Sequence, residues 1–556
     1  MASALELSAP SWLVWRVIGA IASACFCTFF YRLYRTRSLF REVSGKYGIP
    51  ILPHSFLLGH LPIMIRLAKQ TQSDIFANYI PLLLALEYPE MAEAGLFYID
   101  LWPVAPAMLA VFDPDMMAQF TQETSLPKHE MMRREFFPFT GCNDLVNQEG
   151  QEWKAWRSIF NPGFSVKNIT ALVPAFLEEI QVFKDWLVSI AETGEVVEME
   201  GPAMKAAMDV IGRAILDCRL HCQTEELPFY KALKDQVSWM LFDGMPRTLL
   251  KQANPFRRLI IWNNNRIMKN FLKPHIEKGV AQYVAGKLDG VKTINSLAVK
   301  AYVEQIQSAG SKANMTGVDP HFVDMAIAQL KIFFLAGHDT TATALSCACH
   351  LLHKNPHTLA ALRAEHDAVF GRDPTTARAQ IAANPQLLNQ LPYTSAVIKE
   401  TLRFYPPVGT VRQGQPGFFL THPESGRRHP TAGFLVLSCS FAEQRMAKYW
   451  ARAGEFLPER WLVRDERDPL HVRKNAFRSF ELGPRGCIGQ ELAQMELRAI
   501  LAMTVRELDI ESAYAADAPE VLGEKAYQVL VPGELTGHPK GGVPIRVKIR
   551  DWQSLA

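Results

Sequence analysis

The first apolar run of the chain is long enough to cross a membrane. Residues 12–31 are apolar apart from Arg16 and a few small polar side chains, and about twenty such residues span a bilayer as a helix. Four arginines follow directly: Arg32, Arg35, Arg37 and Arg41. Basic flanks stay on the cytoplasmic side, so the downstream chain is expected to face the cytoplasm. A cleaved signal peptide is the alternative, but it lacks a basic start and a clear cleavage site.

Further along, the apolar spacing is mostly helical. Residues 170–310 carry long amphipathic runs, and the longest helix is predicted from Asp319-Pro320 to Lys354, where Asn355-Pro356 stops it. Asp is a favoured N-cap and Pro a favoured first helical residue. Gly337 lies beside Asp339 in the middle of this helix, where helix propensity should be highest. Two interpretations remain open: a local opening of the helix, or a glycine that allows a close helix contact.

Short segments predict a smaller β-rich part. The apolar run 108–112 is typical of a strand, residues 407–436 alternate as in a small sheet, and residues 527–548 alternate around Gly533 as in a hairpin. A helix is predicted to begin at Gln490. The expected organisation is therefore an anchor with its basic flank over residues 1–45 and one mainly α domain with a smaller β part over residues 46–556.

Composition excludes several classes of protein. The 556 residues are 48% apolar and 21% charged, with a net charge of +3, which is ordinary for a chain with a large core and predicts no nucleic-acid partner. The nine cysteines are too sparse for a disulfide framework, and a reducing, cytosol-facing location suits them.

One cysteine is placed for chemistry. Cys487 lies in the loop Phe480-Glu-Leu-Gly-Pro-Arg-Gly-Cys-Ile-Gly489, which contains three glycines and Arg485. Glycine permits backbone angles and close approaches that a Cβ would obstruct. A thiolate just before a helix N-terminus is stabilised by the dipole, so a lowered thiol pKa is expected here. The alternative is a buried loop cysteine without a ligand role.

The pattern Phe480-x-x-Gly483-x-Arg485-x-Cys487-x-Gly489 resembles the haem-binding loop of the cytochrome P-450 monooxygenases. The resemblance implies a thiolate-ligated haem b whose axial iron ligand is Cys487, with Phe480, Gly483, Arg485 and Gly489 shaping its site. A thiolate ligand favours O–O cleavage. It also implies the cytochrome P-450 fold, mainly α with a smaller β part, after a single N-terminal transmembrane helix.

Other segments match the family in the same order along the chain. Ala336-Gly337-His338-Asp339-Thr340 resembles its oxygen-activation motif, in which Thr340 would contact dioxygen and Asp339 would help relay protons. Trp153 and Arg157 stand four residues apart on one helical face. A guanidinium and an indole N–H suit a haem propionate, although a Trp–Arg stack on a surface helix is the alternative.

The remaining expectations also come from the resemblance. Arg412 falls where the family commonly has a further propionate contact, and Gln444 replaces a histidine but still offers a donor. Glu400 and Arg403 would form a buried structural network with Arg460. Three aromatic residues are expected over the substrate cavity or, equally, in the core: Phe136, Phe137 and Phe139. Three basic residues are candidates for a face that docks a redox partner: Arg473, Lys474 and Arg478.

The function implied by the resemblance is insertion of one oxygen atom from O₂ into a lipophilic small molecule, as in fungal secondary metabolism. No nucleotide-binding fingerprint occurs in the sequence, so a separate NADPH-dependent flavoprotein reductase is expected. The location would be the endoplasmic reticulum membrane, single-pass, with the catalytic domain in the cytoplasm. A haem-thiolate isomerase or lyase that needs neither O₂ nor reductase, and a non-catalytic haem sensor, are the alternatives.

Overall fold

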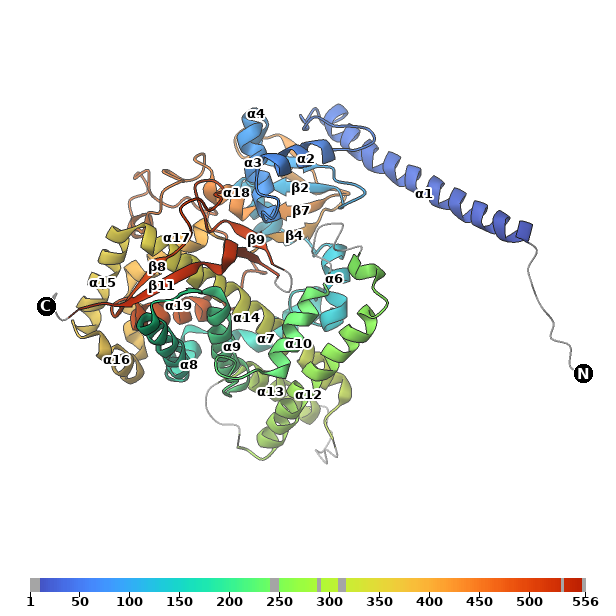
Figure 1. Ribbon diagram of the computed structural model, residues 1–556. Coiled ribbons are helices and arrows are strands. Elements are labelled where there is room, and N and C mark those ends of the chain that lie inside the picture. The colour runs from blue at the N-terminus through green and yellow to red at the C-terminus, as the bar shows by residue number, and fades with distance from the viewer. Residues whose placement is uncertain (1–10, 241–249, 288–291, 309–316, 532–534, 553–556) are drawn as a thin grey trace, which may run out of the picture.

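The computed structural model describes residues 11–240, 250–287, 292–308, 317–531 and 535–552. It shows a mainly helical body with small sheets, preceded by one long helix that projects from the body (Figure 1). This confirms the predicted fold class.

The projecting helix is α1 (Ser11–Gly45), and its two parts have different surroundings. Large apolar side chains in its first part are exposed, including Trp15 and Phe26, whereas Leu33, Phe40 and Val43 in its last part are buried against the body. By length and composition α1 is able to cross a membrane. The exposed part therefore fits the expected anchor, and the last turns belong to the body.

Arg37 departs from the expectation for the basic flank. It is only 1% exposed and forms an ion pair with the carboxylate of Asp100, which also lies 2.8 Å from Nε2 of His54. Its guanidinium donates to the carbonyl oxygens of Phe56 at 2.8 Å and Leu57 at 2.9 Å. A buried charge needs such partners, so Arg37 fixes the end of α1 to the body instead of facing a membrane surface.

The strands form four small sheets. The largest has the order β1-β2-β7-β4, with β2 and β7 parallel; its strands are β1 (Leu96–Ile99), β2 (Met108–Val111), β7 (Leu435–Ser438) and β4 (Thr410–Gln413). The second has the order β3-β11-β8, with β3 (Val196–Glu198), β11 (Pro544–Ile549) and β8 (Leu508–Ser512). Two hairpins complete the set: β5 (Phe419–Thr421) with β6 (Arg428–Pro430), and β9 (Gln528–Leu530) with β10 (Gly537–Pro539). The predicted strand, small sheet and C-terminal hairpin are confirmed, while Gly533 lies outside the described residues.

Helices make up most of the body. Those near α1 are α2 (Leu61–Gln70), α3 (Ile80–Glu87), α4 (Pro89–Ala92) and α5 (Pro114–Ala118). The central ones are α6 (Glu130–Thr140), α7 (Gly150–Phe160), α8 (Val166–Thr193), α9 (Glu200–Leu216), α10 (Pro228–Ser238), α12 (Arg257–Val284), α13 (Ile294–Ser308) and α14 (Pro320–Lys354). The last are α15 (Pro356–Phe370), α16 (Ala377–Ala383), α17 (Pro392–Phe404), α18 (Ser440–Arg445) and α19 (Gln490–Thr504).

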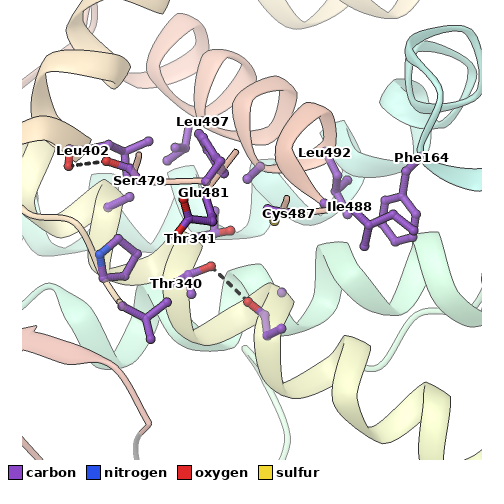
Figure 2. Close-up of a pocket in the computed structure, with 18 of the residues that line it drawn as sticks. Phe164, Thr340, Thr341, Leu402, Ser479, Glu481, Cys487, Ile488, Leu492 and Leu497 are labelled. Carbon is purple, nitrogen blue, oxygen red and sulfur yellow. Dashed lines mark hydrogen bonds between the residues drawn. The ribbon is translucent and has the colours of Figure 1, made fainter. Parts of the chain in front are cut away.

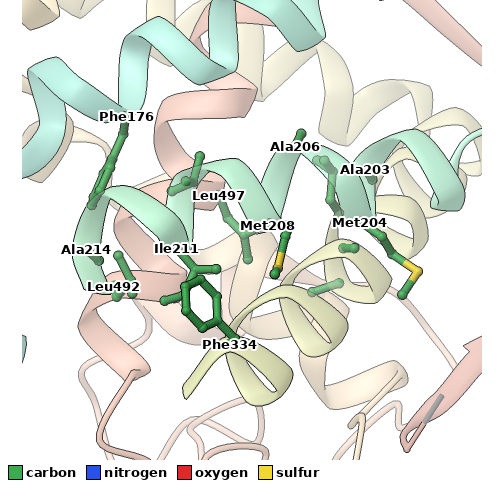
Figure 3. Packing of buried hydrophobic residues seen from close by; sticks show 14 of the residues in the cluster. Phe176, Ala203, Met204, Ala206, Met208, Ile211, Ala214, Phe334, Leu492 and Leu497 are labelled. Atoms are coloured by element: carbon green, nitrogen blue, oxygen red, sulfur yellow. The ribbon is translucent and has the colours of Figure 1, made fainter. Parts of the chain in front are cut away.

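Helix α14 is the axis of the body, and its predicted limits are confirmed. The Asp319 carboxylate caps its first turn by accepting from the backbone N–H of His321. Helix α9 packs along α14 and is covered by α8 and α19; Figure 3 shows Ile211 of α9 among Phe334 of α14 and Leu492 of α19. Burial of this apolar seam stabilises the fold.

The structure decides between the two interpretations of Gly337. Helix α14 is continuous through this residue, which favours the close helix contact over a local opening. A Cβ at Gly337 would lie 2.7 Å from the Cγ1 atom of Ile211, closer than two carbon atoms can approach. The glycine therefore allows α9 to cross α14 at short range.

Candidate active site

A cavity lies between α14 and the loop that carries Cys487 (Figure 2). It contains about 1200 Å³ of space not filled by atoms, part of which is open to solvent. Figure 2 shows Cys487 on the α19 side and Thr340 on the α14 side. Apolar residues form much of its wall, including Phe164, Ile211 and Phe333. A large apolar cavity with few polar groups is typical of a site for a flat or lipophilic ligand.

The backbone of the cysteine loop is held in a specific shape. Gly483 has φ +90°, and a Cβ there would lie 2.4 Å from the carbonyl oxygen of Thr121, so only glycine fits. The Cys487 N–H donates to the carbonyl oxygen of Phe480 at 2.8 Å. Gly489 is the N-cap residue of α19. Phe480, Cys487 and Gly489 all line the cavity, as the sequence indicated.

The expected lowering of the Cys487 thiol pKa is wrong for this structure. Desolvation by the surrounding protein atoms raises the pKa, although the Cys487 side chain is exposed to the cavity, and the opposing effects of the Gly489 and Gln490 amides and the Arg157 charge are smaller. Desolvation disfavours a thiolate that has no cation in contact with it. Two amides at the helix start are therefore not enough by themselves to ionise this thiol.

Arg485 and Trp153 lie together beside the cavity. The guanidinium of Arg485 lies 4.0 Å from the ring centroid of Trp153, and it donates to the carbonyl oxygen of Gln148 at 2.8 Å and pairs with Glu149. Trp153 is 9% exposed. The buried stack therefore joins Trp153 to Arg485, which itself lines the cavity, whereas the alternative was a surface stack of Trp153 on Arg157.

Arg157 and Arg412 approach the site differently. Arg157 donates to the carbonyl oxygen of Gly486 at 2.9 Å, which ties α7 to the cysteine loop. Arg412 is fully buried, yet its Nε and Nη2 atoms have no hydrogen-bond partner among the described residues. Burial lowers its pKa to about 10, and the nearby Arg485 charge acts in the same direction. An anion at this position would satisfy both nitrogens.

Lys128 forms a positive cluster with Arg412 and Arg485. Its place at the site was not predicted from the sequence. Burial and the charges of Arg412 and Arg485 lower its pKa to about 7, although Glu149 acts in the opposite direction. Its position in a polar stretch after Pro127 gave no signal. Because the cluster combines Lys128 with two arginines, it is more positive than its own acidic neighbours can balance.

The two residues of the oxygen-activation motif, Asp339 and Thr340, lie on different faces of α14. Thr340 lines the cavity and donates to the carbonyl oxygen of Ala336 at 3.0 Å. Asp339 is 1% exposed and lies on another face, where its Oδ1 is 3.0 Å from Nε2 of His538. Nδ1 of His538 is in turn 2.8 Å from Oε1 of Glu200. The sequence gave no reason to connect His538 or Glu200 with this motif.

The predicted network around Glu400 is buried below the cavity. Glu400 and Arg403 are 0% exposed and 2.8 Å apart, and Nε of Arg460 lies 3.1 Å from Glu400. The indole of Trp461 donates to Glu400 at 2.9 Å. The three expected residues therefore meet as one hydrogen-bonded group.

The structure decides the open choice for the aromatic residues in favour of the core, and it corrects the role expected for Gln444. Residues Phe136 and Phe139 are packed in the core on α6, Phe137 is 66% exposed, and none of the three lines the cavity. Gln444 uses its amide donors on the carbonyl oxygens of Leu402 and Arg403 and on Ser479, so it holds the loop instead of a propionate.

The expected docking face also changes. Arg478 is 2% exposed and pairs with Glu481 beside the cavity, so it is not on the surface. Arg473 forms an ion pair with Asp115 at 2.6 Å, and only Arg473 and Lys474 of the three remain exposed.

Comparisons with known proteins decide the family. Residues 98–535 match the model of the family described as "Cytochrome P450". The chain belongs to the cytochrome P450 family. It is 37% identical over 96% of its length to cytochrome P450 monooxygenase polC of Polytolypa hystricis, of which it covers 95%. It is 32% identical over 82% of its length to cytochrome P450 monooxygenase acrF of Aspergillus aculeatus, of which it covers 94%.

The fold is also that of a solved member. The haem domain of cytochrome P450DA superposes with a TM-score of 0.65 at 21% identity, covering 91% of this chain and 98% of that structure. The protein is therefore a P450 monooxygenase, and its cofactor is a thiolate-ligated protoporphyrin IX haem. As in other members, it needs a redox partner, O₂ and a substrate.

Proposed function

We propose that this P450 inserts one oxygen atom of O₂ into a lipophilic small molecule, by hydroxylation, epoxidation or a related oxidation, in fungal secondary metabolism. The carrying observation is the cavity in which Cys487 and Thr340 lie on opposite sides of an apolar space. The fungal relatives are themselves described as monooxygenases. Apolar walls favour a substrate that leaves water readily.

In this proposal Cys487 is the axial ligand of the haem iron, and the haem supplies the oxygen chemistry. Gly483 and Gly489 allow the loop to approach the ring, with Phe480 beside it. The positive cluster would hold the propionates: Arg412 offers two nitrogens without partners, Arg485 of the cysteine loop lies near it, and Trp153 and Arg157 are supplied by α7. Charge-assisted bonds to guanidinium groups are the strongest available for a carboxylate.

The roles proposed for α14 are proton handling and orientation. Thr340 presents its hydroxyl to the cavity and Asp339 supplies protons from the face behind it. The Glu400–Arg403–Arg460 group is proposed to have a structural role, since it is fully bonded within the protein.

The location proposed is the endoplasmic reticulum membrane. Helix α1 would form a single-pass anchor within residues 1–45, and the catalytic domain, residues 46–556, would face the cytoplasm, where an NADPH-dependent flavoprotein reductase supplies electrons. The support is the exposed apolar part of α1 and the arginines that follow it.

The test is product analysis with the full chain in yeast microsomes that contain a reductase. Candidate lipophiles are supplied under ¹⁸O₂, and one labelled oxygen atom in a product is the expected result. A product formed without reductase and O₂ would indicate an isomerase or lyase. Ligand-induced spectral change without any substrate-dependent O₂ uptake would indicate a sensor. Either result contradicts the proposal.

Two variants test the site itself. Cys487→Ser is expected to abolish the absorbance shift that the reduced, carbon monoxide-bound P450 shows, and an unchanged spectrum would refute the ligand assignment. Thr340→Ala is expected to keep the haem but to divert electrons from product to hydrogen peroxide. Undiminished product per electron in Thr340→Ala would remove this hydroxyl from the reaction.

A further inference from the structure

A histidine from the C-terminal hairpin lies between two buried carboxylates. His538 is on β10, Asp339 is in the middle of α14, and Glu200 begins α9. The exposed fractions of the three residues are 1%, 1% and 5%. The ring nitrogens of His538 lie 3.0 Å from Asp339 and 2.8 Å from Glu200. Three elements that are distant in sequence therefore meet at one imidazole.

Two threonine hydroxyls complete the surroundings of the ring. Thr343, one helical turn after Asp339, lies 3.3 Å from Nδ1 of His538 and donates to Glu200 at 3.2 Å. Thr536 lies 3.2 Å from Nε2. Two carboxylates and two hydroxyls around one ring favour the imidazolium form, because each stabilises a positive charge or an N–H.

The electrostatics agree with this arrangement. The two carboxylates raise the pKa of His538 well above its ordinary value, and His538 lowers the pKa of Asp339 to about 2 despite burial. Burial lowers the pKa of His338, which lies beside Asp339 in sequence. The other charged groups that interact with this cluster are Glu198 before α9 and Lys234 on α10.

We propose that His538 is a positioning residue for proton supply: as a buried imidazolium held by Glu200, it keeps Asp339 ionised and oriented behind Thr340. The proposal rests on the roles of Asp339 and Thr340 given under Proposed function. A carboxylate buried without a cation takes up a proton near neutral pH. It is then a weaker acid, and it passes protons to the cavity less readily. The hairpin, and not a neighbouring helix, thus supplies the cation.

The main variant is His538→Gln in the full-length protein, reconstituted with reductase. We expect haem to be retained, and product per electron to fall several-fold with a matching rise in peroxide. This loss should become smaller as pH rises across the neutral range, because Asp339 then ionises without help. In the wild type, product per electron should not increase with pH over this range. Wild-type yield at every pH in His538→Gln would overturn the proposal.

A readout independent of turnover is the thermal unfolding temperature as a function of pH. Because the folded pKa of His538 is raised, its stabilising effect is fully present below the ordinary pKa of 6.5 and is lost as pH rises towards the folded pKa. The unfolding temperature of the wild type should therefore exceed that of His538→Gln most below pH 6.5, and the gap should narrow above it. A gap that does not vary with pH would indicate a packing role alone.

Two further variants separate the possible failures. His350→Gln is the matched control, because His350, on α14, is also a buried histidine that faces a carboxylate, 3.3 Å from Glu524. Its product per electron should stay at the wild-type value. Asp339→Asn tests the underlying role. If Asp339→Asn gives the wild-type product per electron, the role of Asp339 under Proposed function fails. If only His538→Gln gives the wild-type product per electron, this inference fails.

Glu200→Gln keeps the proposal testable even if His538→Gln does not fold. It leaves the contact between His538 and Asp339 intact but removes one of the two anions that hold the imidazolium. The pH above which the unfolding temperature begins to fall, as His538 loses its proton, should therefore be lower in Glu200→Gln than in wild type. An unshifted profile in Glu200→Gln would contradict the proposal.

Discussion

Two groups of buried arginines differ in how completely the protein satisfies their hydrogen bonds. Arg403 makes five hydrogen bonds, to both oxygens of Glu400 and to the carbonyl oxygens of Gln444, Ala453 and Glu455, which matches the five N–H donors of a guanidinium. Arg412 makes one long bond to the carbonyl oxygen of Val411, at 3.3 Å, and leaves Nε and Nη2 without partners.

The difference separates a structural group from a ligand-binding one. The Glu400 group is complete within the chain, since Glu400 also accepts from Arg460, from Trp461 and from the backbone of Leu457. The Arg412 group has an excess of positive charge next to a cavity. Buried polar groups without partners are costly, so the second group is explained best by an anionic ligand, and the family's haem carries two propionates.

The largest effect is expected from Glu400→Ala. Removing the one anion leaves two buried guanidinium groups uncompensated, and breaking such a buried group costs about 3–5 kcal/mol. The detergent-solubilised protein should unfold at much lower temperature, as followed by tryptophan fluorescence, with or without haem.

The matched control for this variant is Glu455→Ala. Glu455 pairs with Arg452, and both side chains are 54% exposed, so its loss should leave the unfolding temperature nearly unchanged, because exposed ion pairs are screened by water. Equal effects of Glu400→Ala and Glu455→Ala would show that the buried group is not the stabilising one.

An intermediate effect is expected from Arg412→Ala, and it should depend on haem. One charge-assisted hydrogen bond is worth about 1.5–3 kcal/mol, so haem affinity should fall by roughly ten- to a hundred-fold by the same relation. The affinity is measured by transfer of haem to an acceptor protein.

Stability without haem should be unchanged or higher in Arg412→Ala, because the buried charge is gone. Arg427→Ala, on an exposed loop, is the control and should leave haem transfer unaltered. Unchanged haem transfer in Arg412→Ala would remove this arginine from the propionate site.

The smallest effect is a pH dependence at Lys128. Burial and its positive neighbours lower its pKa from 10.5 to about 7 in the folded protein. A lysine whose pKa is lowered destabilises the fold fully below pH 7, and this cost disappears as pH rises towards 10.5. Haem-free protein should therefore become more stable over this range relative to Lys128→Met.

Haem should abolish most of that difference, because propionates nearby stabilise the charged lysine. Unfolding temperatures of the two proteins, with and without haem, measure the effect. A pH-independent difference between them would place Lys128 outside the positive cluster.

Local sequence patterns predicted the parts that depend on neighbouring residues. Asp319 and Asn355-Pro356 mark the ends of α14 because capping and proline act within a turn, and Cys487 is recognised by the glycines around it. The partners of Asp339 were not predictable in this way. His538 and Glu200 belong to other elements, and no periodicity connects a strand residue with a helix residue so far away in the chain. The same holds for Lys128, whose pKa depends on two distant arginines.

Gly337 and Arg37 show a second reason for error. Each has a local signal with two physical explanations, a helix opening or a helix contact for Gly337, and a membrane flank or a buried ion pair for Arg37. Only the surrounding packing decides between them, through Ile211 in one case and Asp100 in the other.

The ion pair of Arg37 has a mechanical consequence. Helix α1 has no break between its exposed apolar turns and the turn that carries Arg37, and the body grips that turn through Asp100 (Figure 1). The helix is therefore a rigid extension of the body and not a flexible tether. In a bilayer, its tilt would set the height and rotation of the whole catalytic body, so a thicker or thinner lipid layer would reorient that body.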